Sequence, residues 1–129
     1  MDKDTVILVT LAPKTHRTSE ENLGLAYLKA VLVKKGYRVE IIDGWLNEYD
    51  IETVYNMIIP KKESLLFVGI SSYMSNTKPT IDLIEKLKKF DRNIKIACGG
   101  FGPTFYPEDY LNSGSDYVMR GEGEKSGNK

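Results

Sequence analysis

The sequence of 129 residues has one cysteine, one histidine and no long apolar run. One cysteine excludes an internal disulfide and a metal site built from several cysteines, and one histidine leaves no catalytic triad to assemble. No run approaches the roughly 20 apolar residues that span a membrane, and the first residues lack a signal-peptide pattern. We therefore expect a soluble, cytoplasmic protein in which Cys98, near the end of an apolar run, is a buried thiol.

An excess of charge is also missing, because 18 acidic residues balance 18 basic ones. This balance gives no electrostatic basis for binding nucleic acid or an anionic membrane. The first predicted loop has no glycine-rich phosphate cradle, which excludes a Rossmann fingerprint and a P-loop. Phosphoacceptor receiver domains need acidic residues and a lysine at positions that here hold Ala12-Pro13, Ser71-Ser72 and Arg120-Gly121, so phosphotransfer is excluded as well.

What the sequence does contain is a regular alternation of strand and helix patterns. Five short apolar runs cover residues 6–11, 38–42, 65–71, 94–97 and 117–119. Between them, apolar residues repeat with helical spacing over 25–32, 51–58 and 81–87, and a weaker helical pattern covers 108–111. The alternation predicts an α/β fold: a flavodoxin-like (Rossmann-like), doubly wound sheet of five parallel strands in the order 2-1-3-4-5.

The C-terminal end of this pattern lacks a full fifth helix, because few residues follow Glu124. We therefore expect a domain over residues 1–124, cut at its C-terminal boundary, and a polar tail over 125–129. In a 2-1-3-4-5 sheet the first and fifth helices share one face, so we expect the apolar strands 6–11 and 65–70 to be partly uncovered there. The remaining domains of a larger enzyme, or self-association, would cover this face.

Unusual residues follow four of the predicted strands, in the segments 12–22, 71–77, 99–107 and 120–124. In open parallel sheets, ligands bind at the carboxyl ends of the strands. We therefore expect these segments to line one cleft. The segment "CGGFGPTFYPEDYL" leaves an unusually bare backbone after the fourth strand, so either the turn is unusual or a ligand approaches it closely.

Four segments carry a resemblance to a known family: "GLAYLKAVLVKKGYRVEIID", "GISSY", "CGGFGPTFYPEDYL" and "DYVMRGEGE", in that order. Together they resemble the N-terminal cobalamin-binding domain of cobalamin-dependent radical S-adenosylmethionine enzymes. The resemblance implies that cobalamin binds at the carboxyl edge of the sheet. The iron–sulfur cluster needs three cysteines in a separate domain, so this chain would hold the cofactor and supply no catalytic residue of its own.

The resemblance also implies which residues form the cofactor site. The nucleotide tail of cobalamin would lie beside the third and fourth strands, where Gly99 and Gly100 leave room for it. Ser71 or Ser72 would hydrogen-bond the tail. Two glycines that make only a tight turn remain the alternative. The other residues implied are Tyr73, Met74, Phe101, Gly102, Thr104, Gly121 and Glu122.

Two segments allow more than one interpretation. His16 lies where the wider cobalamin family has its Asp-x-His-x-x-Gly motif, but Lys14 and Ser19 replace the Asp and the Gly. The Asp normally orients the histidine, so we predict no metal ligand here and keep cobalt ligation by His16 as the alternative. Arg120 either pairs with a nearby glutamate to end the last strand or, with "GEGE", shapes the floor of the site.

Two functions from other classes remain open at this stage. One is a flavodoxin-like flavin or nucleotide binder, in which Thr15, Thr18 and Ser19 would hold a phosphate. The other is a non-catalytic interaction module with the same fold. The reading that the motifs favour is the cobalamin-binding part of a radical S-adenosylmethionine methyltransferase or related enzyme.

Overall fold

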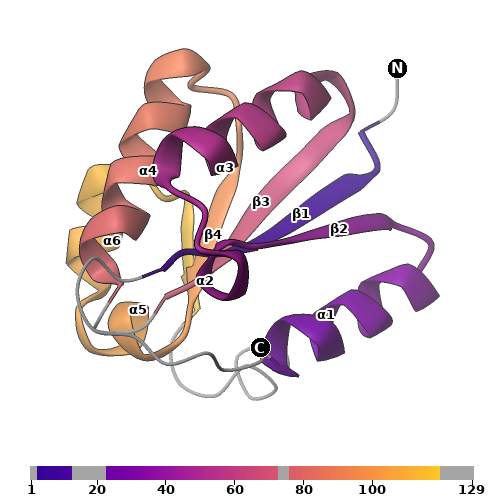
Figure 1. Ribbon diagram of the computed structural model, residues 1–129, viewed down its shortest axis with the longest axis horizontal. Coiled ribbons are helices and arrows are strands. Elements are labelled where there is room, and N and C mark those ends of the chain that lie inside the picture. The colour runs from indigo at the N-terminus through magenta and orange to yellow at the C-terminus, as the bar shows by residue number, and fades with distance from the viewer. Residues whose placement is uncertain (1–2, 13–22, 73–75, 120–129) are drawn as a thin grey trace.

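A computed structural model describes residues 3–12, 23–72 and 76–119. Its five strands form one sheet in the order β2-β1-β3-β4-β5, and every pair of neighbours is parallel. Figure 1 shows the strands side by side across the middle of the molecule. This sheet confirms the predicted fold class and strand order. The strands are β1 (Thr5–Thr10), β2 (Arg38–Asp43), β3 (Leu65–Ser71), β4 (Ile96–Gly99) and β5 (Tyr117–Met119).

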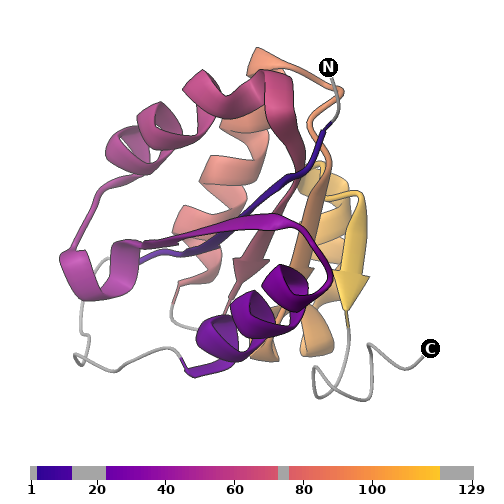
Figure 2. The same ribbon diagram turned by 90° about the vertical axis from the view of Figure 1, so that its right-hand side faces the viewer.

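Helices cover both faces of the sheet. In Figures 1 and 2, α3, α4 and α6 lie on one face, and α1 lies on the other. The short helix α5 lies near the ends to which the strand arrows point. The helices are α1 (Leu23–Lys34), α2 (Gly44–Asn47), α3 (Ile51–Ile58), the 3-10 helix η1 (Ile59–Ser64), α4 (Thr77–Phe90), α5 (Phe101–Phe105) and α6 (Pro107–Ser113).

The helix ends follow from local chemistry. Asp50 caps α3 because its carboxylate accepts a hydrogen bond of 2.8 Å from the Thr53 N–H. Pro60 lies in the first turn of η1, where the α-helical pattern ends. Gly36 follows α1 with a φ of 98°, a conformation that favours glycine. Helices α1 and α3 therefore end close to Gly36 and Pro60, the residues whose backbone chemistry interrupts them. The predicted weak helix over 108–111 is present as α6, and the segment before it, where no helix was expected, contains the additional short helix α5.

The main core lies between the sheet and the layer of α3, α4 and α6. Strand β1 lies inside the sheet, between β2 and β3, and all six of its residues are buried. Cys98 is buried in this core at 1% exposure, as predicted. Burial raises the pKa of its thiol to about 11, and a hydrogen bond from Ser115 offsets only part of that rise. Neutral Cys98 therefore packs as an apolar side chain.

The second face has a smaller core beneath α1. Val6 and Leu8 of β1 are at most 3% exposed and pack against Leu32 of α1 and against neighbouring strand residues that include Val39 and Phe67. The expectation that strand 6–11 is partly uncovered is therefore wrong, because α1 and the side chains of β2 and β3 bury it. The exposed part of this face lies farther along the sheet, where Tyr117 and Met119 of β5 are 59% and 37% exposed.

Over residues 3–12, 23–72 and 76–119, no helix has the length and apolar character needed to cross a membrane.

Candidate functional site

The carboxyl ends of the central strands meet at one edge of the sheet. Ser71, the last residue of β3, pairs with Thr10 of β1 and with Gly99 of β4. Gly99 pairs in turn with Met119 of β5. The structure therefore brings Ser71 and Gly99 side by side, as the sequence predicted. Other predicted site residues lie outside the described residues, namely His16, Tyr73, Met74, Gly121 and Glu122.

A strip of small residues lies on the α1 face of β3 and β4. Val68, Ile70, Ile96 and Cys98 belong to the main core, and successive residues of a strand point to opposite faces. The alternate positions therefore face the other way, and all of them are half-buried. This small-residue strip consists of Gly69, Ser71, Ala97 and Gly99.

Gly99 has little of the described chain in front of it. A Cβ atom added there would meet one described atom within 4 Å, the Met119 Cβ at 3.7 Å. That distance is an ordinary van der Waals contact, and the φ of Gly99 is not in the left-handed region. Neither strain nor crowding from the described residues demands glycine at this position, so these residues leave the backbone of the strip open to the approach of a ligand.

Gly100 is glycine for a different reason. Its φ is 111°, which L side chains rarely adopt. A Cβ atom added there would lie 2.4 Å from the Ser72 carbonyl oxygen, which is backbone and cannot move aside cheaply. The turn interpretation therefore applies to Gly100, and the ligand interpretation retains its support at Gly99.

The two candidate serines also point in different directions. The Ser72 side chain is fully buried, and its hydroxyl contacts the Tyr110 hydroxyl at 2.8 Å and the Asn76 Oδ1 at 3.2 Å. This contact places it toward the layer of α4 and α6. Ser71 is the serine on the small-residue strip, so of the two it is the one placed to contact a ligand there.

The turn after β4 is tied to the end of β3. The Ser72 N–H donates to the Gly99 carbonyl at 2.8 Å, and the buried Gly102 N–H donates to the Ser72 carbonyl at 3.2 Å. The Thr104 hydroxyl donates to the Gly100 carbonyl at 2.7 Å. Gly102 and Thr104 thus shape the turn through the backbone. Phe101 begins α5, and its side chain lies outside what the structure describes.

Sequence reasoning missed Asn76 and Tyr110 as parts of this region. Asn76 directly precedes α4, but its side chain makes no cap hydrogen bond. Its Nδ2 instead donates to the Leu11 carbonyl at 2.8 Å, across to the end of β1. Tyr110 lies in the weakly predicted helix and gave no signal, although it is among the largest fully buried side chains.

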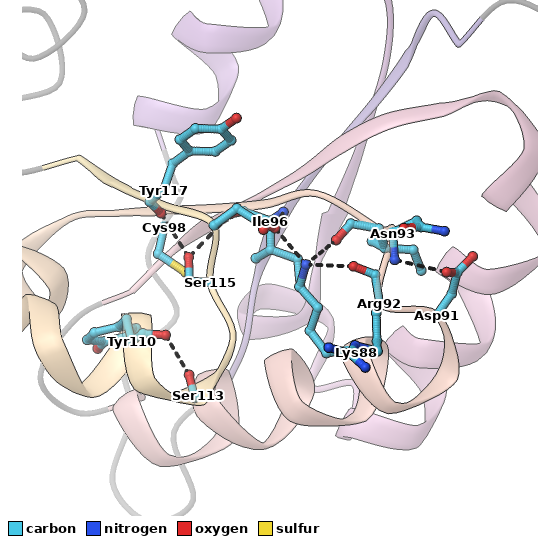
Figure 3. Close-up of polar contacts among 12 residues, drawn as sticks. Lys88, Asp91, Arg92, Asn93, Ile96, Cys98, Tyr110, Ser113, Ser115 and Tyr117 are labelled. Atoms are coloured by element: carbon cyan, nitrogen blue, oxygen red, sulfur yellow. Dashed lines mark hydrogen bonds and ion pairs between the residues drawn. The ribbon is translucent and has the colours of Figure 1, made fainter.

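The opposite, amino end of β4 and β5 is held by charge. The Lys88 amine donates to the Ile94 carbonyl at 2.6 Å and pairs with Asp116 at 2.7 Å, and the Asp116 carboxylate also accepts from the Ile96 N–H at 2.9 Å. Figure 3 shows Lys88 beside the start of β4, with Ser115 near Cys98 and Tyr117. Burial alone would raise the pKa of Asp116, but these hydrogen bonds and the positive charge of Lys88 lower it. These groups join strands and lie away from the site.

Metal-ligating residues do not cluster in the part of the chain that the structure describes. No group of three or more His, Cys, Asp or Glu residues there could hold a metal ion. The small-residue strip instead offers a flat, bare backbone and one hydroxyl. Such a surface suits a bulky organic ligand rather than a bare cation.

The family comparison decides between the ligands that this edge could take. The family model for the B12-binding domain matches residues 10–127. The chain belongs to the B12-binding domain family. The membership confirms the cobalamin reading over the flavin or nucleotide alternative, and the cofactor of this domain is cobalamin.

Solved structures show the same fold as this B12-binding domain. A radical S-adenosylmethionine methyltransferase, TsrM, from Kitasatospora setae, with cobalamin and a 4Fe–4S cluster bound, has a TM-score of 0.71 at 22% identity. The match covers 95% of this chain and 23% of the TsrM chain, so this chain spans about a quarter of that enzyme's length. A second TsrM structure, with tryptophan substrate and an analogue of S-adenosylmethionine bound, has a TM-score of 0.68 at 22% identity, covering 95% of this chain and 24% of that one.

Two other matches extend the fold beyond cobalamin proteins. A putative pilus assembly-related protein from Burkholderia pseudomallei has a TM-score of 0.61 at 18% identity, covering 92% of this chain and 78% of that chain. A CheX–CheY complex from Borrelia burgdorferi has a TM-score of 0.65 at 12% identity, covering 91% and 78%. At these identities the likeness concerns the fold alone. A search of curated protein sequences gave no match.

Proposed function

We propose that this chain is the cobalamin-binding domain of a radical S-adenosylmethionine enzyme, a methyltransferase or a related enzyme. Three observations support the proposal: the family membership, the fold shared with the cobalamin-bound TsrM, and the motifs quoted from the sequence. The single structural observation that carries it is the space in front of Gly99, because that glycine has no other explanation in the described chain.

The small-residue strip would hold the nucleotide tail of cobalamin. Ala97 and Gly99 would form its floor, and the Ser71 hydroxyl would donate to or accept from the tail. Met119, 37% exposed on β5, would flank it. Four residues would support the strip indirectly, because they shape the turn after β4: Ser72, Gly100, Gly102 and Thr104. Tyr73, Met74, Phe101, Gly121 and Glu122 stay predictions that rest on the family resemblance.

The division of labour follows from what the chain contains. Cobalamin supplies methyl-carrying or rearrangement chemistry, and the protein supplies placement and electronic tuning. An iron–sulfur cluster and S-adenosylmethionine would belong to another domain, as the cluster bound in TsrM suggests. The partners of this domain would be the remaining domains of the enzyme. The cytoplasmic location, the domain boundary at Glu124 and the absence of cobalt ligation by His16 stay predictions.

The test is retention of cobalamin by the purified chain. Protein mixed with hydroxocobalamin and then desalted should keep the corrin absorption bands, whereas protein mixed with a flavin nucleotide should keep no flavin bands. Retained flavin with no retained corrin would overturn the proposal, and retention of neither would point to an interaction module.

Cobinamide, which keeps the corrin ring but lacks the nucleotide tail, tests the position of the tail. We expect cobinamide to bind much more weakly than hydroxocobalamin in a calorimetric titration, because it leaves the small-residue strip empty. Equal affinities would leave cobalamin as the cofactor but would show that its nucleotide tail does not bind in the small-residue strip.

A further inference from the structure

A chain of buried hydrogen bonds lies directly behind the proposed site. It joins Thr77, Tyr110, Ser72, Asn76 and the Leu11 carbonyl, and we call it the Tyr110 network. Ser72, Asn76 and Tyr110 are all fully buried. Its contacts are 3.0 Å from Thr77 to Tyr110, 2.8 Å from Tyr110 to Ser72, 3.2 Å from Ser72 to Asn76, and 2.8 Å from Asn76 to the Leu11 carbonyl.

Which group donates and which accepts in each hydrogen bond of the network follows from the chemistry of the groups that it joins. The Leu11 carbonyl can only accept, so the Asn76 amide group must face it and the Asn76 Oδ1 must face Ser72. Ser72 has one hydroxyl proton, which it donates to Asn76, so Tyr110 must donate to Ser72. Tyr110 then accepts from Thr77. All bonds run in one sense, an arrangement in which each bond strengthens the next.

The network connects three segments that are distant in the sequence. Leu11 follows β1, Ser72 follows β3, and Tyr110 is the member contributed by α6. The Ser72 and Tyr110 hydroxyls are separated by 38 residues. A phenyl ring would fill the same volume as tyrosine without any polar group to desolvate. The hydrogen bonds of Tyr110 therefore specify a geometry that apolar packing of a phenyl ring alone would leave less well defined.

Ser72 transmits this geometry to the opposite face of the sheet. Its backbone N–H donates to Gly99, its carbonyl accepts from Gly102, and the same carbonyl is the atom against which Gly100 is packed. Ser71 and Gly99, on the small-residue strip, are the covalent or hydrogen-bonded neighbours of Ser72. A shift of Ser72 would therefore move both of them.

We infer that Tyr110 is a positioning residue for the cobalamin site. Through Ser72 it holds the ends of β3 and β4 in the geometry that the nucleotide tail requires, without touching the cofactor. The inference rests on the proposed function, since it names the residue that preorganises the same site.

The experiment compares Tyr110→Phe with Lys88→Met as a matched control. Both variants remove polar side-chain contacts, but the Lys88 side chain, from α4, makes its contacts beside the amino end of β4, away from the site. At a temperature where both variants are folded, we expect Tyr110→Phe to bind hydroxocobalamin about fivefold or more weakly. Lys88→Met should lose stability and keep the wild-type affinity.

Amide hydrogen exchange of the cofactor-free protein supplies a readout that does not depend on cobalamin. In Tyr110→Phe, the amides of Ser72 and Gly102 should exchange faster than the rest of the sheet, and in Lys88→Met they should not. Wild-type affinity together with wild-type exchange at these two amides would overturn the inference. Failure of the wild-type protein to retain cobalamin would overturn the proposed function, while the exchange measurement would still decide the positioning role.

Thr77→Val is the second variant if Tyr110→Phe does not fold. Thr77 is half-buried and donates to the Tyr110 hydroxyl, so its replacement removes that donor and leaves the Tyr110 ring in place. We expect a smaller loss of affinity, of the same kind. Unchanged affinity and exchange in a folded Thr77→Val protein would count against the network.

Discussion

At the residue scale, Gly99 and Gly100 differ in what surrounds a Cβ atom added at each position. At Gly100 the Cβ atom collides with the Ser72 carbonyl, and the backbone has a positive φ. At Gly99 it meets the Met119 Cβ at an ordinary distance. The same residue type thus has a conformational explanation at one position and a ligand-related explanation at the next.

We predict that Gly99→Val keeps the fold but weakens cobalamin binding at least tenfold. Valine suits a strand and frees the chain of the entropic cost of glycine, so the melting temperature should stay the same or rise. Its methyl groups would occupy the small-residue strip. Calorimetric titration with hydroxocobalamin, with the melting temperature measured in parallel, checks both halves of the prediction. The control is Gly100→Ala, which should destabilise the protein by about 2 kcal/mol or more through strain and collision.

Thr80 supports a prediction about stability alone. Its side chain is fully buried in α4, and among the described residues its hydroxyl oxygen is a buried side-chain atom without a hydrogen-bond partner. Burying an unpaired hydroxyl costs about 1–3 kcal/mol. We therefore expect Thr80→Val, which has nearly the same shape, to raise the free energy of unfolding by about 1 kcal/mol in urea denaturation. A loss of stability would show that the hydroxyl has a partner in solution, such as a water molecule.

At the scale of elements, β5 is a strand of only three residues that is held at its start by an ion pair. Asp116 precedes β5, and its carboxylate accepts from Lys88 of α4 and from the first N–H of β4. Three elements therefore meet at one carboxylate. The ion pair with Lys88 needs an ionised Asp116, and ionisation also strengthens the hydrogen bond from the Ile96 N–H, so the attachment of this edge of the sheet depends on pH.

The sign of that dependence follows from the lowered pKa of Asp116 in the folded protein. The contribution of Asp116 to stability is fully present above its unfolded pKa of about 3.9 and is lost as the pH falls through the lower, folded value. We expect Asp116→Asn to lower the free energy of unfolding by about 1–2 kcal/mol at pH 7. The difference from wild type should shrink below about pH 4. A difference that stays constant from pH 7 to pH 2.5 would contradict the role of the charge.

At the scale of the whole molecule, the two faces of the sheet are covered unequally. Helices α3, α4 and α6 cover one face, and among the described helices α1 covers the β1–β2 part of the other (Figure 2). The exposed rings and side chains beyond α1 include Tyr117 and Met119. Exposed apolar surface of this kind is typical of an interface with a partner.

We expect the isolated, cofactor-free chain to self-associate through the β5 edge of this face, beside the small-residue strip that cobalamin would occupy. At roughly 25 cal/mol per Å², burying about 400 Å² would contribute on the order of 10 kcal/mol before association costs. Light scattering at micromolar concentration should show a dimer or a larger species, and Tyr117→Lys should shift it toward the monomer. Leu111→Lys, at a residue 45% exposed on α6, is the control on the opposite side. A monomeric wild-type chain would remove self-association and leave the remaining enzyme domains as the partner.

The sequence by itself determined the class of fold, the order of the strands and the family. The apolar periods of strands and helices are local properties, and Gly36 and Pro60 interrupt them through their own backbone chemistry. The parallel order follows from the regular alternation and from the handedness of crossovers. The motif around Gly99 and Gly100 pointed to cobalamin because it combines several residues in a fixed spacing.

Only the tertiary structure decided which residues of that motif face the open strip and which hold the turn. Ser71 and Ser72 are adjacent in the sequence, but the pleat of β3 sends one to the strip and the other into the Tyr110 network. Tyr110 and Asn76 are identified only in the folded structure. Strand register and helix packing bring Tyr110 into contact with Ser72, 38 residues away, and Asn76 into contact with Leu11, 65 residues away. A periodic pattern records how each segment faces the core, but a hydrogen bond between distant segments depends on where the folded chain places them both.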